Sequence, residues 1–85
     1  MITINVDGDE TEQFFDRRLT TDEVRNFVGG PWKIEGVIVR GKKKYSVLAL
    51  ARGWRTEDVN HPAGLLVGRM IYGPVVLLEK GVEIA

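Results

Sequence analysis

The chain has no cysteine, one histidine and three prolines among its 85 residues. Without cysteine it can form no disulfide, thiolate nucleophile or cysteine-ligated metal site, as is typical of intracellular proteins. Neither sign of charge dominates, because 12 Lys and Arg balance 12 Asp and Glu. Proteins that imitate DNA are strongly acidic and dedicated nucleic-acid binders are usually basic, so this balance argues against both classes.

Long apolar runs are also missing from the sequence. No stretch approaches the roughly 20 apolar residues that cross a bilayer, and no secretory signal pattern stands at the N-terminus. We therefore expect a cytoplasmic protein that does not bind membranes. The length corresponds to a single domain, residues 1–85, with one small core.

A short helix followed by two glycines is the clearest local signal. Thr20 and Glu23 have the spacing of a capping box, and an apolar stripe follows them, which predicts a helix over residues 21–28. Gly29 and Gly30 permit a left-handed helix end, and Pro31 prevents the helix from continuing. The next residue, Trp32, is predicted to begin a strand.

Residues 32–51 predict an antiparallel hairpin with a two-residue turn at Gly41 and Lys42. Read away from the turn, the predicted pairs are Ile38–Tyr45, Gly36–Val47, Ile34–Ala49 and Trp32–Ala51. The opposite face mixes charged residues with four aliphatic ones, which are Val37, Val39, Leu48 and Leu50. If the helices cover only the first face, these four predict a surface for self-association.

Two further pairs of elements complete the expected fold. Alternation over residues 2–6, a tight turn at Asp7–Gly8 and a second strand over residues 11–17 predict an N-terminal hairpin. Asn60 is predicted to cap a helix over residues 61–67. The apolar run 70–78 suits a central strand, in which Gly73–Pro74 implies a bulge, a bend or an edge position. The fold class is α+β: a small, mainly antiparallel sheet with two short helices packed against it.

Five positions mark these elements together, namely Gly29, Gly30, Asn60, Ala63 and Gly73. Through them, together with Ile34–Glu35 and Val75–Val76, the chain resembles over roughly residues 20–78 a family of small phage, plasmid and bacterial proteins, domain of unknown function 3846. The resemblance implies an origin in a phage or another mobile element, and it supplies no catalytic residue. Members of that family often carry an acidic stretch after the third strand, where this chain has a basic and aromatic one.

That basic and aromatic stretch contains the strongest candidate binding residues, Arg52, Trp54 and Arg55. Arginines beside a tryptophan offer stacking and cation–π contacts to a base, a nucleotide or a protein. Trp32 is predicted at the same end of the sheet and joins the candidates, although we expect it to fill the core. Trp54 is either a recognition residue or a loop tryptophan folded back over the core.

A second basic cluster, the basic tip, lies at the hairpin turn and comprises Arg40, Lys42, Lys43 and Lys44. It either contacts phosphates or keeps the tip soluble and discourages edge pairing, and the absence of an aromatic residue at the tip favours the second interpretation. About eight strand residues, or roughly 26 Å, separate it from Trp54. The two clusters therefore do not form one compact patch.

No constellation in the sequence supports catalysis. His61 lacks a paired nucleophile or acid, no ligand spacing specifies a metal, and no glycine loop has a phosphate-binding context. We therefore expect no enzymatic activity, cofactor or metal. The leading hypothesis is a small accessory protein from a phage or mobile element that acts by binding a protein partner or itself. The alternative is a nucleic-acid or nucleotide binder that uses the Arg52–Trp54–Arg55 segment, and an antirestriction or other anti-defence role fits either.

Overall fold

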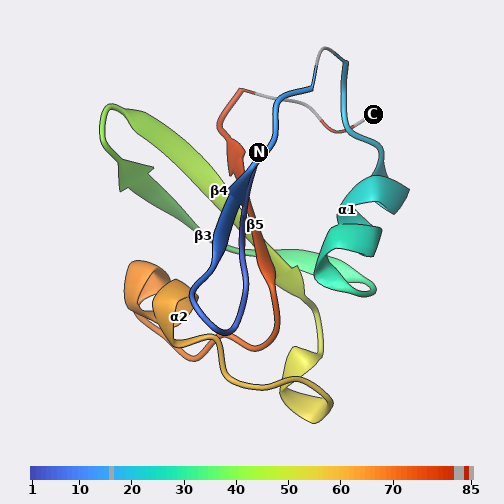
Figure 1. Cartoon of the computed structure of the whole chain (residues 1–85), viewed down its shortest axis with the longest axis vertical. Helices are drawn as coiled ribbons and strands as arrows, with labels where there is room; N and C mark the ends of the chain where they lie inside the picture. The colour runs from blue at the N-terminus through green and yellow to red at the C-terminus, as the bar shows by residue number, and fades with distance from the viewer. Residues whose placement is uncertain (16, 82–83, 85) are drawn as a thin grey trace.

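The computed structural model describes residues 1–15, 17–81 and 84. In this part of the chain, five antiparallel strands form one sheet in the order β2-β1-β5-β4-β3, with two α-helices beside it (Figure 1). The elements are β1 Ile2–Ile4, β2 Glu10–Glu12, α1 Thr21–Val28, β3 Trp32–Arg40, β4 Lys43–Leu50, the 3-10 helix η1 Gly53–Arg55, α2 His61–Val67 and β5 Val75–Glu79. The predicted α+β class, the mainly antiparallel sheet and the two short helices are confirmed. β5 is the central strand, but it begins at Val75, so the strand predicted over residues 70–78 is wrong in extent.

The N-terminal hairpin is shorter than the sequence predicts. β1 and β2 pair across a turn in which Gly8 has a φ of 93°. The second strand predicted over residues 11–17 is wrong in extent, because β2 ends at Glu12 and Phe14 projects into solvent. Residue 16 of that range lies outside the described residues. β2 is an edge strand, so no outer neighbour extends its pairing.

The capping box predicted for α1 is present. The Thr20 hydroxyl accepts from the Glu23 N–H at 3.1 Å, and the Glu23 carboxylate accepts from the Thr20 N–H at 3.0 Å. Arg17 donates to both oxygens of that carboxylate, at 2.7 and 2.8 Å. The Arg17 hydrogen bonds, followed by the Thr20 N–H, lower the pKa of Glu23 to about 2. Gly29 ends the helix with a φ of 95°, as predicted.

The β3–β4 hairpin keeps the predicted register only near its turn. The pairs Ile38–Tyr45 and Gly36–Val47 are confirmed, but a β-bulge at Glu35 then shifts the register by one residue. Beyond the bulge the pairs are Ile34–Leu48, Lys33–Ala49 and Trp32–Leu50. The extra residue is held on the α2 side, because Arg69 donates to the Glu35 carbonyl and its Nε lies 3.5 Å from the Glu35 carboxylate.

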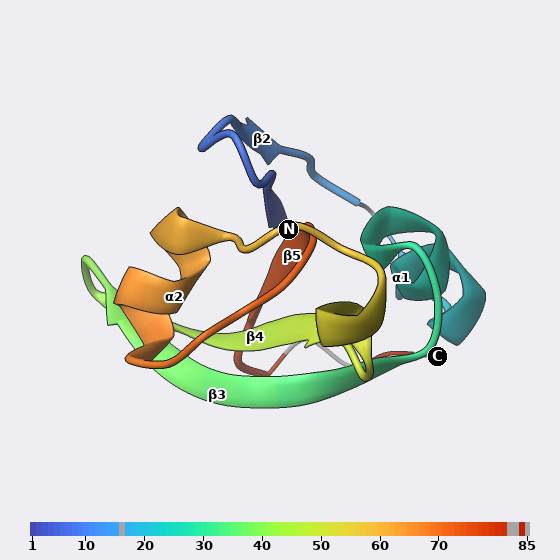
Figure 2. The same cartoon turned by 90° about the horizontal axis from the view of Figure 1, so that it is seen from below.

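The two helices cover opposite faces of the sheet (Figures 1 and 2). On the α2 side, Val47, Ala49, Val75 and Leu77 form a core with Ile4, Ile38, Ala63 and Ile71. On the α1 side, a second core comprises Leu19, Val24, Val28, Leu48, Val76 and Leu78. Each face of β4 and β5 is therefore buried, and each helix supplies one apolar stripe.

This arrangement corrects the predicted self-association face. Leu48 is 1% exposed, and the half-buried Leu50 packs against the same core. Of the four predicted residues, only Val37 and Val39 are exposed. The prediction required a face without a helix, and α1 occupies that face over β4 and β5.

Asn60 caps α2, as predicted, and it also joins three elements from a fully buried position. Its Oδ1 accepts from the Ala63 N–H at 3.1 Å. Its Nδ2 donates to the carbonyls of Ile4 at 3.0 Å and Gly73 at 2.9 Å. The side chain thus connects α2 to β1 and to the turn before β5, where Gly73 has a φ of 79°.

The sheet is strongly curled. Arg40 and Glu10 belong to its two edge strands, yet Nη2 of Arg40 lies 2.8 Å from the Glu10 carboxylate. Four strand spacings in a flat sheet would separate those edges by roughly 19 Å. The edges therefore bend toward each other, and α2 lies between the β1–β2 hairpin and β3 (Figure 2). The radius of gyration, 11.8 Å, is that of one compact domain of this length.

Candidate functional site

β3 is a nine-residue edge strand with exposed aliphatic side chains. Ile34 is 60% exposed, Val37 52% and Val39 67%. All three lie on the α1 face. Ile34 pairs with Leu48, which belongs to the core under α1. Val37 and Val39 pair with Ser46 and Lys44, which share the face of Leu48 because alternate residues of a strand point to the same side. We call these side chains, together with the outward backbone groups beside them, the β3 edge.

The outward backbone groups of β3 belong to Val37 and Val39. A two-residue turn makes Arg40–Lys43 a hydrogen-bonded pair, and such pairs alternate along an antiparallel ladder, so Val39–Lys44 is not one. The carbonyl of Lys44 supports this assignment, since it accepts from the Lys80 N–H at 2.8 Å on the opposite side of β4. The N–H and C=O of Val37 and Val39 therefore point away from β4, where another strand would pair.

The other edge strand, β2, is protected against such pairing. It has three residues, all exposed, and two of them are glutamates. Short, charged edges discourage the addition of a strand. From Gly36 to Val39 the β3 edge has neither charge nor proline, and the bulge at Glu35 interrupts only its first half. The contrast identifies β3 as the edge that is open to a partner.

Trp54 is the second candidate. It is 61% exposed, so it does not fold back over the core, and the Arg55 guanidinium lies 5.0 Å from the centre of its ring. With Lys33, Arg69 and Tyr72 it lines a groove of about 200 Å³ on the α2 side of the sheet. An exposed indole with cations nearby can stack on a planar group and attract an anion.

The other predicted members of the Trp54 site lie elsewhere. Arg52 lines a separate cleft of about 550 Å³, together with Gly29 and Gly30. Trp32 is half-buried in the core on the α1 side, where its indole N–H donates to the Thr21 carbonyl at 3.5 Å. The structure thus brings Trp54 and Arg55 together and places Arg52 and Trp32 in different surroundings.

Three charged residues of the Trp54 groove were not among the predicted site residues. The Glu35 carboxylate is almost buried, with Lys33 Nζ at 3.3 Å and Arg69 Nε at 3.5 Å. Two cations and one carboxylate leave this side of the groove with a net positive charge. Lys33 and Glu35 alternate on a strand, which is a local signal for a shared face. Arg69 is 34 residues from Glu35 in sequence, and no local signal connects them.

The basic tip is partly neutralised by carboxylates. Arg40 is bound by Glu10, and Lys43 Nζ lies 3.7 Å from Glu79. Lys42 and Lys44 project into solvent. Carboxylates beside two of the four cations favour the interpretation of the tip as a solubilising turn over that of a phosphate-contacting one.

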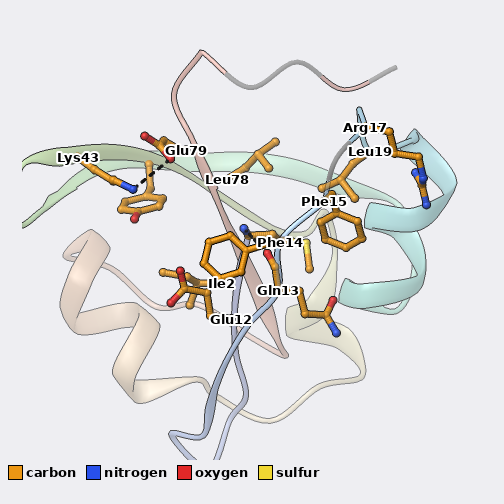
Figure 3. Close-up of a pocket in the computed structure, with 12 residues that line it drawn as sticks. Ile2, Glu12, Gln13, Phe14, Phe15, Arg17, Leu19, Lys43, Leu78 and Glu79 are labelled. Carbon is orange, nitrogen blue, oxygen red and sulfur yellow. Dashed lines mark hydrogen bonds and ion pairs between the residues drawn. The ribbon is translucent and has the colours of Figure 1, made fainter.

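A pocket of about 180 Å³ lies beside the N-terminus (Figure 3). Figure 3 shows the Lys43–Glu79 ion pair at one end and Arg17 at the other, with the rings of Phe14 and Phe15 between them. The charged groups do not converge on one point where a reacting atom could sit. We therefore assign this pocket no chemistry.

The described side chains form no metal centre. In residues 1–15, 17–81 and 84, no three His, Cys, Asp or Glu side chains gather where they could hold a metal ion. His61 is exposed at the start of α2. None of the helices in the described part of the chain combines the length and the apolar character of a membrane span.

Comparison with known proteins identifies no relative: no family model matches the chain, and neither does any curated protein or solved structure. The resemblance to domain of unknown function 3846 stays a prediction.

Proposed function

We propose that the chain is a small, non-enzymatic protein-interaction module that accepts a β-strand from a protein partner along the β3 edge. One observation carries the proposal: Val37 and Val39 combine exposed side chains with backbone groups that point outward. A strand added there would gain affinity from main-chain hydrogen bonds and specificity from alternate side chains. A cytoplasmic location and an origin in a phage or mobile element belong to the same proposal.

A selection from random peptides tests the proposal, because it requires no candidate partner. Short peptides selected on the immobilised chain should be rich in β-branched residues, since an added strand must fit the valines of the β3 edge. In NMR titrations, the largest amide shifts should fall on residues 36–40. Val37→Lys should weaken binding by at least about tenfold, since charge on an edge strand opposes pairing.

The matched control is Leu65→Lys, which places the same charge at an exposed aliphatic residue of α2 instead of β3. It should leave peptide affinity unchanged, and circular dichroism should show that both variants fold. Shifts centred on α2 or on the Trp54 groove would contradict the proposal. So would equal affinity for the wild type and Val37→Lys.

The exposure of Trp54 favours a second candidate, a nucleic-acid or nucleotide binder that uses Trp54 and Arg55, while Arg52 lines a separate cleft. Stacking of a base on an exposed aromatic residue contributes about 1–3 kcal/mol. The cations of the groove add salt-dependent attraction. An anti-defence role is compatible with this candidate and with the protein-binding one.

The second candidate predicts that a single-stranded oligonucleotide quenches tryptophan fluorescence at low salt. Trp54→Ala should weaken binding by about tenfold, which corresponds to roughly 1.4 kcal/mol and lies within the usual stacking range. Trp32→Phe is the control and should preserve both affinity and quenching. Absence of quenching at low salt would exclude base stacking at Trp54.

A further inference from the structure

We infer that the strand that occupies the β3 edge is β3 of a second copy of this chain, so that two five-stranded sheets join across a two-fold axis. This inference rests on the proposed function, since it requires the β3 edge to accept a strand.

The outward backbone groups determine the register. An antiparallel pair centred on Ile38 places Val37 opposite Val39 of the second copy, and Val39 opposite Val37. Both residues have outward N–H and C=O groups, so each of these two pairs exchanges two hydrogen bonds. A centre at Val37 would place the bulge residue Glu35 opposite Val39, and a centre at Val39 would pair Val37 with the turn residue Gly41. Ile38 is thus the centre that keeps residues 36–40 in regular strand on both copies.

The side chains suit this self-pairing. On the α1 face, Val37 and Val39 of both copies form a cluster of four valines that two-fold symmetry places side by side. On the other face, Gly36 lies opposite Arg40 of the second copy. Because glycine has no side chain, Arg40 can keep its ion pair with Glu10.

Charge supports a second copy as the occupant. The formal net charge is zero, so two copies do not repel each other as highly charged domains do. No charged side chain lies between Gly36 and Val39, so no like charges face each other at the centre of the pair. Five paired residues on each side bury less than the roughly 1,200 Å² of a standard interface. We therefore expect a concentration-dependent dimer with a dissociation constant in the micromolar range, on the order of 1–100 µM.

Sedimentation velocity on the full chain tests the dimer over roughly 1–500 µM, a range that brackets the expected dissociation constant. The mass should rise from the 9.5 kDa of the monomer toward twice that value. Val39→Pro should raise the dissociation constant more than about tenfold, because it removes an outward N–H while the bonds to β4 remain. Val39→Thr keeps the N–H and the β-branched shape, so its affinity should stay within about threefold of wild type.

Hydrogen exchange gives a readout that needs no variant. The amides of Val37 and Val39 should become protected as the chain concentration rises, while exposed amides elsewhere should not. A monomer at every concentration would overturn the inference, as would a dimer in which these two amides stay unprotected. If the chain is monomeric but selected peptides still bind residues 36–40, the self-pairing is wrong and the proposed function stands. If the chain is monomeric and the selected peptides do not bind residues 36–40, the self-pairing and the proposed function are both wrong.

Discussion

Replacing Asn60 with leucine should lower the free energy of unfolding by about 3–5 kcal/mol. The substitution leaves the Ala63 N–H without its acceptor and removes the buried Asn60 donor from the Ile4 and Gly73 carbonyls. Each buried polar group that loses its partner costs about 1–3 kcal/mol. A domain of this length has a total stability of roughly 4–13 kcal/mol, so this loss would remove much of it. Urea unfolding followed by circular dichroism measures the effect.

Asn60→Asp separates the cap of α2 from the contacts to β1 and Gly73. Aspartate is a good N-cap and keeps an acceptor for the Ala63 N–H. It has no amide donor, however, and its charge would lie against the carbonyls of Ile4 and Gly73. It should therefore destabilise the fold by at least about 2 kcal/mol. Stability within about 1 kcal/mol of wild type would show that Asn60 acts only as a helix cap.

The exposed cap of α1 provides a comparison. Thr20→Ala removes one hydrogen bond to the Glu23 N–H at a position open to solvent. It should cost about 1 kcal/mol, as caps usually do. The loss in unfolding free energy for Asn60→Leu, minus the loss for Thr20→Ala, measures what burial and the two additional contacts of Asn60 contribute.

Local chemistry explains which parts of the fold could be predicted. The spacing of Thr20 and Glu23, the glycine at position 29 and the cap at Asn60 act over four residues or fewer, and each was predicted and is observed. The pairs nearest the Gly41–Lys42 turn are also local, because turn length determines their register.

The remaining errors arise from contacts that are distant in sequence. The bulge at Glu35 is held by Arg69, which no pattern near residue 35 reveals. The alternation in β4 shows two faces but not that α1 covers the second one. β5 enters the sheet between β1 and β4 and leaves β3 at the edge. That strand order depends on the whole topology, so the sequence predicted Val37 and Val39 as contact residues without showing the open backbone beside them.

The candidate site at Trp54 also combines features that local sequence indicates with features that depend on the three-dimensional structure. The sequence left two alternatives for Trp54, exposed recognition or burial over the core, and its 61% exposure decides for the first. The separation of Arg52 from Trp54 could not be predicted, since it depends on the single turn of η1, which begins between them. The charge of the basic tip also depends on residues that are distant in sequence, because Glu10 and Glu79 form ion pairs with it from β2 and β5.

Leu48→Ala should lower the free energy of unfolding by about 3 kcal/mol, whereas Val37→Ala should change it by less than about 0.5 kcal/mol. Sequence alternation assigns both residues to one face, but α1 buries Leu48 beside Val76 and leaves Val37 in solvent. Unfolding should be measured at low chain concentration, so that self-association does not stabilise the wild type. Leu48→Met, which conserves volume, is the control and should cost less than about 1.5 kcal/mol. Equal, small losses for Leu48→Ala and Val37→Ala would mean that α1 does not pack on this face. A large loss only for Leu48→Ala would mark the boundary between the core under α1 and the β3 edge that is open to a partner.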